Sequence, residues 1–192
     1  DCLLSRGLGD VYKRQDDIAY NNHDIQDGFK AKMFTLNQLI EIDFFKDIYN
    51  SHKKNINKNN KEILIYQIIR DSINLMVKDL IQNTIKNLKM NKIISIKNIY
   101  TLKAPLVCFS KKYLEIEKEI RFFLRTNMYN HKNVLTKNNE GKKIIKDLFI
   151  MIKNKPNKFL TKEDLKKDGF RSIADFISGM TDRFAINLHK TI

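Results

Sequence analysis

Residues 16–28 read DDIAYNNHDIQDG, and this stretch has the pattern of a helix with one polar face. It contains no proline and its single glycine comes last, so we expect the helix to end at Gly28. Side chains four residues apart share a face, so Asp16, Tyr20 and Asp24 form one polar row. The row spans roughly 12 Å, enough for one carboxylate to hold a metal ion while the other meets a sugar hydroxyl. A solvated or helix-capping row is the alternative.

The composition is that of an ordinary folded protein with a large excess of positive charge. The chain has 192 residues, 42% of them hydrophobic, which indicates one domain or a domain with an appendage. With 36 Lys and Arg against 22 Asp and Glu, the net charge is +14. That excess favours nucleic acid, anionic lipid or nucleotide phosphates as partners. The lysines are scattered among many Asn and Ile, as in an AT-rich coding sequence, so a merely solvated basic surface is the alternative.

Cysteine content and hydropathy indicate a cytoplasmic protein without a membrane partner. The two cysteines support neither a disulfide framework nor a zinc site, which favours a reducing compartment. No apolar run reaches the roughly 18 residues of a membrane span. The first fifteen residues lack the apolar segment of a secretory signal.

The remaining chain reads as a succession of amphipathic helices, which predicts an all-α, multi-helix fold around one core. Residues 51–60 form a polar link, and residues 93–109 are irregular, with short strand-like runs that we do not assign to a sheet. Thr35 and Ser110 are candidate N-caps. Helices are expected over residues 36–50, 61–90, 110–129, 138–153 and 172–190, with a short one after Thr161. The buried side of the longest helix is expected to carry Ile65, Ile68, Ile69, Leu75, Met76, Leu80, Ile85 and Leu88.

Four stretches resemble a known family in the same order along the chain. Residues 16–28 resemble the last catalytic helix of the deoxyguanosine triphosphate triphosphohydrolase-like family, within the HD phosphohydrolases. ADFISGMTDRFA, residues 174–185, resembles the closing segment of that family. RDSINLMVKD (residues 70–79) and MYNHKNV (residues 128–134) are similar to it too. The resemblance covers nearly everything from Asp16 onward, and two long motifs in order make it specific.

The resemblance implies a metal-dependent reaction on a nucleotide. In that family, water attack releases inorganic triphosphate from a deoxynucleoside triphosphate beside a divalent metal ion such as Mg or Mn. Matched residue by residue, Asp16 is a metal ligand, Tyr20 contacts the phosphate and sugar region, and Asp24 accepts from the sugar 3′-hydroxyl. The resemblance also implies a homo-oligomer in the full-length protein, and a nucleic acid effector is a further possible partner.

Most of the expected metal site has no counterpart in this sequence. The family holds its metal with a His, an adjacent His-Asp pair and a distant Asp, and only the distant Asp is matched. His23-Asp24 is a literal His-Asp pair, but it lies beyond the metal Asp and we interpret it as a coincidence. We therefore expect a C-terminal fragment that is inactive alone.

The resemblance also suggests how the chain is divided. Residues 1–15, DCLLSRGLGDVYKRQ, look like a non-native adapter-like tail, with a genuine disordered N-terminus as the alternative. Residues 16–60 are then the end of the HD catalytic domain, and residues 61–192 are the C-terminal helical HD-associated domain. The competing hypothesis for function is a basic helical module that binds single-stranded nucleic acid without catalysis.

Overall fold

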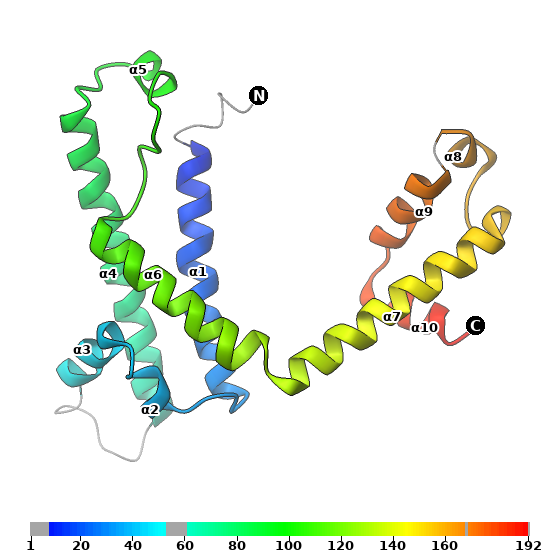
Figure 1. Ribbon diagram of the computed structural model, residues 1–192, viewed down its shortest axis with the longest axis horizontal. Helices are drawn as coiled ribbons and strands as arrows, with labels where there is room; N and C mark the ends of the chain where they lie inside the picture. Colours follow the sequence, from blue (N-terminus) through cyan, green and yellow to red (C-terminus); the bar gives the residue numbers. More distant parts are fainter. Residues whose placement is uncertain (1–7, 53–60, 168, 192) are drawn as a thin grey trace. The chain divides into compact units, whose positions relative to one another are not determined.

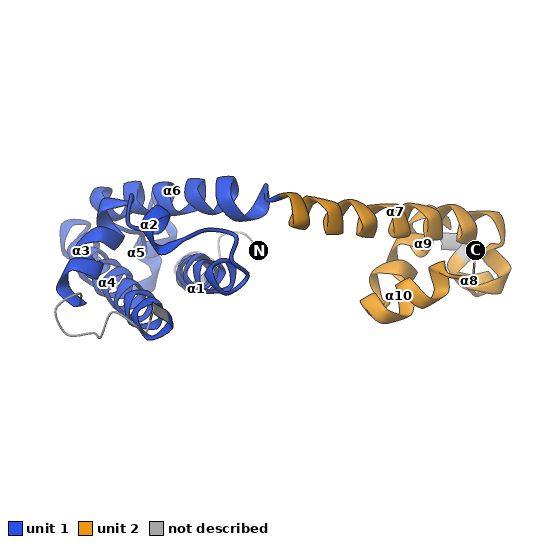
Figure 2. Cartoon of the chain, turned by 90° about the horizontal axis from the view of Figure 1, so that it is seen from below, with its two compact units in different colours: residues 1–131 blue, residues 132–192 orange. Residues whose placement is uncertain are grey.

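The structure is a computed structural model that describes residues 8–52, 61–167 and 169–191. All regular structure in these residues is helical, so the all-α prediction is confirmed. The expected link over residues 51–60 lies mostly outside the described residues. The chain divides into two compact units, residues 1–131 and residues 132–192, each of which is described by itself (Figure 2). Among the described residues, no helix combines the length and the apolarity that crossing a membrane requires.

In the first unit the described residues form six α-helices, of which α1 lies alongside the long α4 and α6 packs against α1 (Figure 1). In chain order they are α1 (Leu8–Lys30), α2 (Leu36–Leu39), α3 (Asp43–His52), α4 (Lys61–Met90), α5 (Ile96–Tyr100) and α6 (Lys111–Leu124). A π-helical turn, Arg125–Tyr129, continues α6. In this turn each N–H donates to the carbonyl five residues earlier instead of four. The second unit contains α7 (Lys132–Asn154), a 3-10 turn (Pro156–Lys158), α8 (Lys162–Lys167), α9 (Gly169–Ser178) and α10 (Asp182–His189).

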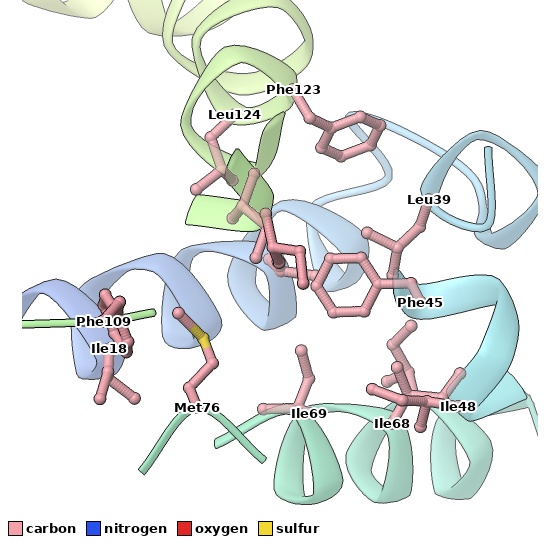
Figure 3. Packing of buried hydrophobic residues seen from close by; sticks show 14 of the residues in the cluster. Ile18, Leu39, Phe45, Ile48, Ile68, Ile69, Met76, Phe109, Phe123 and Leu124 are labelled. Atoms are coloured by element: carbon pink, nitrogen blue, oxygen red, sulfur yellow. The ribbon is translucent and has the colours of Figure 1, made fainter. Parts of the chain in front are cut away.

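Helix α4 supplies the central apolar stripe of the first unit (Figure 3). Its predicted bounds are confirmed, and so is burial of Ile65, Ile68, Ile69, Met76 and Leu80. Burial of Leu75 and Ile85 was wrong, since they are 37% and 47% exposed. At this point of α4 the fully buried Met76 faces the core, and Leu75 lies about 100° round the helix from it, toward solvent.

The helices α1 and α4 end in the same way, at a lysine rather than at a glycine. Lys32 and Lys92 have φ of 56° and 49°, the left-handed conformation that usually favours glycine. After α1, the N–H of Met33 donates to the Gly28 carbonyl (2.9 Å) and that of Lys32 to Phe29 (3.0 Å), which is a Schellman motif. The prediction that α1 ends at Gly28 was therefore wrong by two residues.

The helix predicted over residues 36–50 is two helices instead of one. Thr35 caps α2 as predicted, with a reciprocal capping box to Gln38. The chain then turns before α3, because a straight helix would place Leu39 and Phe45 roughly 120° apart. The break lets both side chains reach the same core, where each is fully buried. A similar break at residues 179–181 divides the helix predicted over residues 172–190 into α9 and α10.

The described residues before α6 form no strand, and side chains of α4 bind two of their carbonyls. Asn83 Nδ2 donates to the Cys108 carbonyl (2.8 Å) and Asn87 Nδ2 to the Leu106 carbonyl (3.0 Å). Ser110 then caps α6, as predicted, by accepting from the Tyr113 N–H. Helix α7 begins at Lys132, six residues before its predicted start.

Replacing Gly28 by alanine is expected to destabilise the first unit although alanine favours helix. A methyl carbon there would lie 3.0 Å from Cζ of Phe34 and closer still to Cε1. That ring is buried and packs edge-to-face on Phe123, so it has little room to move. Overpacking typically costs about 1–3 kcal/mol, more than the roughly 1 kcal/mol gained from helix propensity.

Gly141→Ala is the matched control for this prediction. Gly141 lies inside α7, and nothing lies within 4 Å of the position its methyl group would take. Only the propensity gain applies there, so stability should rise by about 0.5–1 kcal/mol. Urea unfolding followed by circular dichroism measures both variants. A stabilised Gly28→Ala protein would show that the Phe34 ring yields freely.

Candidate functional site

A hollow of about 470 Å³ lies in the first unit between α1 and the end of α6. Helix α1 contributes Asp16, Asp17, Tyr20 and Asn21, and α6 with its π-helical turn and the next residue contributes Arg121, Arg125, Tyr129 and Asn130. The two helices pack against each other, so these eight residues, called the α1–α6 hollow below, come from segments about 100 residues apart.

The structure brings two of the three predicted site residues into this hollow and places the third beside it. Asp16 is exposed and forms no ion pair with another described residue. Tyr20, 67% exposed, lies one turn further along the same face. Asp24 does not line the hollow, but its Oδ2 accepts a short hydrogen bond from Tyr129, which does. His23 is exposed on another face of α1.

The bond to Asp24 makes Tyr129 an unusually weak acid. Partial burial of the ring and the hydrogen bond to the Asp24 carboxylate, together with its charge, raise the pKa of Tyr129 to about 12. Arg121 opposes this shift. At neutral pH the phenol is therefore a hydrogen-bond donor, and it holds Asp24 close to the hollow.

An ionic cluster supports the floor of the hollow. Arg121 donates to Asp17 (2.6 Å) and to Glu117 (2.7 Å), and Arg14 lies 3.1 Å and 3.4 Å from the same two carboxylates. Burial alone would lower the pKa of Arg121, but the hydrogen bonds and charges of Glu117 and Asp17 raise it. The charge of Arg121 is therefore committed to the protein itself.

Two donors in the hollow remain uncommitted. Arg125 is exposed and pairs with no carboxylate of the described residues. Asn21 is 7% exposed, and its amide nitrogen has no hydrogen-bond partner within the described part of the chain. A buried donor without a partner is costly, which is a reason to expect a ligand or water to complete it. The hollow thus combines a carboxylate for a cation with donors for an anionic or hydroxylated ligand.

The sequence interpretation found the α1 wall of this site but missed the α6 wall. Arg121, Arg125 and Tyr129 are spaced four apart, like Asp16, Tyr20 and Asp24. This repeated spacing could have indicated the second wall, because residues four apart form a polar row along one face of each helix. Within the described residues, no three His, Cys, Asp or Glu side chains come together as a metal site.

Comparison with known proteins agrees with this architecture. Residues 107–191 match a family model described as a phosphohydrolase-associated domain. A deoxyguanosinetriphosphate triphosphohydrolase-like protein of Pelagibacter ubique is 71% identical over 177 residues, which are 92% of this chain and 48% of that protein. Proteins of the same name are 33% identical in Leptospira interrogans (96% of this chain, 50% of that protein) and 35% identical in Bartonella henselae (91% and 45%).

These matches extend over nearly the whole chain. The region matched by the family model, residues 107–191, is helical in the structure and corresponds to a domain associated with phosphohydrolases. The resemblance seen in the sequence is confirmed, since the chain is similar over nearly its whole length to proteins named deoxyguanosinetriphosphate triphosphohydrolase-like. The chain spans about half the length of the curated relatives it matches.

Replacing Tyr129 by phenylalanine is expected to make the free energy of unfolding depend less steeply on pH in the alkaline range. The raised pKa means that folded Tyr129 stays protonated up to about 12, while the unfolded phenol ionises near 10.0. The resulting stabilisation is complete below pH 10.0 and is lost as pH rises through about 12. The urea midpoint of the wild-type chain should thus fall more steeply across this range than that of Tyr129→Phe. Parallel curves would contradict the assignment, and Asp24→Asn should shrink the difference.

Proposed function

We propose that the protein containing these residues hydrolyses a deoxynucleoside triphosphate to a deoxynucleoside and inorganic triphosphate, and that the α1–α6 hollow is one wall of its nucleotide site. The observation that carries the proposal is the convergence of Asp16, Tyr20 and the Tyr129–Asp24 pair on one open hollow that also contains Arg125. The names of the relatives support a nucleoside triphosphate as the substrate class.

Each side chain has a role that suits its surroundings. Asp16 presents an exposed carboxylate that pairs with no described residue, which suits a metal ligand. The exposed phenol of Tyr20 can donate to a phosphate or sugar oxygen. Asp24 can accept from a sugar 3′-hydroxyl in exchange for, or in addition to, the Tyr129 hydroxyl. The guanidinium of Arg125, unlike that of Arg121, has charge to offer a phosphate group.

A divalent metal ion fits only part of what this chain offers. The oxygen of Asp16 is of the kind that Mg²⁺ and Mn²⁺ prefer. A single carboxylate does not make a metal site, and the described residues form no group of three or more His, Cys, Asp or Glu side chains around it. The metal would supply charge stabilisation to the phosphates when bound. We therefore assign no chemical step to this chain alone and expect it to be inactive without further ligands.

A chimera tests the proposal. Residues 16–192 would replace the matching half of a relative that hydrolyses dGTP, and deoxyguanosine and triphosphate would be followed by chromatography with Mn²⁺ present. The chimera should release both products, whereas the present chain alone should release neither. A folded chimera without activity, beside an active parent, would overturn the proposal. Hydrolysis by the chain alone would overturn the expectation that it is inactive.

A further inference from the structure

Helices α1 and α6 pack against each other in a constant register. Three polar pairs join them: Arg14 with Glu117, Asp17 with Arg121, and Asp24 with Tyr129. The members of these pairs are 103, 104 and 105 residues apart in the chain, so a step along α1 is matched by an equal or nearly equal step along α6. In each pair a donor on one helix meets a carboxylate on the other.

One position between these pairs breaks the pattern. Asn21 lies between Asp17 and Asp24 on α1, and the register places it opposite Arg125, at the same separation of 104 residues as Asp17 and Arg121. Asn21 and Arg125 both line the α1–α6 hollow. Asn21 is 7% exposed and its amide nitrogen has no partner in the described chain, and Arg125 pairs with no described carboxylate. Two donors are thus set opposite each other, and neither has an acceptor.

This arrangement is unfavourable for the protein on its own. A buried donor without a partner has lost its hydrogen bonds to water and gained nothing in return. The neighbouring carboxylates are already engaged. Asp17 is shared by Arg121 and Arg14, and its charge is balanced by them. Asp24 accepts from Tyr129. An acceptor from outside the chain completes the position, and a guanidinium beside an amide favours one that carries negative charge.

We propose, on the basis of the function proposed above, that Asn21 and Arg125, called the donor pair below, bind a phosphate oxygen of the nucleotide. Along the axis of α1 the donor pair lies about 7.5 Å from Asp16 and about 4.5 Å from Asp24. It is therefore nearer to the sugar end of the hollow than to the metal end, and it takes the phosphate group next to the sugar. Asn21 donates to this group, and Arg125 donates to it and balances its charge.

Binding of inorganic triphosphate to the present chain tests the donor pair without catalysis. Calorimetric titration in metal-free buffer should show Arg125→Gln binding about 10- to 100-fold more weakly than the unaltered chain, as expected for a lost hydrogen bond to a charged group. Arg183→Gln is the matched control, because Arg183 on α10 is also exposed and pairs with no carboxylate in the described part of the chain. Equal losses in the two variants, or no binding by the unaltered chain, would overturn the proposal.

Asn21→Leu separates a binding role from a structural one. Leucine is close to asparagine in size but has no donor, so triphosphate should bind about 10-fold more weakly. Without ligand the thermal midpoint should stay level or rise, because the amide nitrogen has no hydrogen bond to a described residue that could be lost. A lower midpoint with unchanged affinity would mean that the amide serves the fold by holding a water molecule, and would remove Asn21 from the donor pair. The exposed Arg125 variant keeps the test decisive if Asn21→Leu does not fold.

A second titration, with dGTP, shows which part of the nucleotide the donor pair contacts. Arg125→Gln should weaken the binding of dGTP and of triphosphate by similar factors, because the contact is to phosphate. A loss for dGTP alone would mean that Arg125 contacts the sugar or the base, and would overturn the assignment. These titrations need no turnover, so they fail separately from the proposed hydrolysis, which an inactive chimera would remove.

Discussion

Asp16→Asn is expected to lower dGTP hydrolysis by the chimera by more than about 100-fold. Loss of a group that only orients a metal ligand typically lowers metal affinity or activity 10- to 100-fold. Loss of the proposed ligand itself should lower activity further. Asparagine keeps the size and one oxygen of the side chain but removes its negative charge, so metal affinity falls while packing is preserved. Because Asp16 is exposed and forms no ion pair within the described part of the chain, the change should leave stability nearly unaffected.

The control for this variant is Asp27→Asn, on the same helix. Asp27 is also exposed, but it does not line the α1–α6 hollow. Triphosphate release at several Mn²⁺ concentrations should show a large loss for Asp16→Asn, partly recovered at high metal, and little change for Asp27→Asn. Activity of a folded Asp16→Asn chimera within a few-fold of the parent chimera would remove Asp16 from the metal site.

Phe45→Ala is expected to lower the free energy of unfolding of the first unit by about 3–5 kcal/mol, the usual cost of emptying a buried phenylalanine site. Phe45 is fully buried where α3 meets α4, and its ring packs edge-to-face on Phe44 with centroids 5.2 Å apart (Figure 3). Since domains of ordinary stability unfold with 5–15 kcal/mol, this loss removes a large share of the total.

Tyrosine fluorescence measures this loss in the right part of the molecule. All seven tyrosines lie in residues 1–131, and the chain has no tryptophan, so the signal during urea unfolding reports the first unit alone. Phe122→Ala is the control, because Phe122 on α6 is 72% exposed and its removal opens no cavity. Equal midpoints for the two variants would contradict the packing described for α3.

The sequence predicted those parts of the fold in which a local signal and the core agree. Helix α4 has an unbroken apolar period and no glycine or proline, and its bounds were predicted correctly. Thr35 and Ser110 are caps whose hydrogen bonds stay within three residues, and both caps formed as predicted. Signals of this kind need no knowledge of the tertiary structure.

The errors fall where tertiary packing decides the outcome. Lys32 and Lys92 terminate their helices in a left-handed conformation that their sequence does not announce, since lysine has no preference for it. The turn between α2 and α3 exists because Leu39 and Phe45 must both reach one core. The α6 wall of the hollow required knowing that α6 packs on α1, which no pattern within either helix states.

Where the chain is cut affects the charge balance beneath the α1–α6 hollow. Glu117, 5% exposed, and Asp17 together face two guanidinium groups, and one of these belongs to Arg14. A protein shortened to begin at Asp16 would leave both carboxylates with Arg121 alone, so a buried negative charge would go partly uncompensated. Part of any loss of stability after such a cut is therefore electrostatic, and Glu117→Gln in the shortened protein would remove the uncompensated charge while also weakening the contact with Arg121.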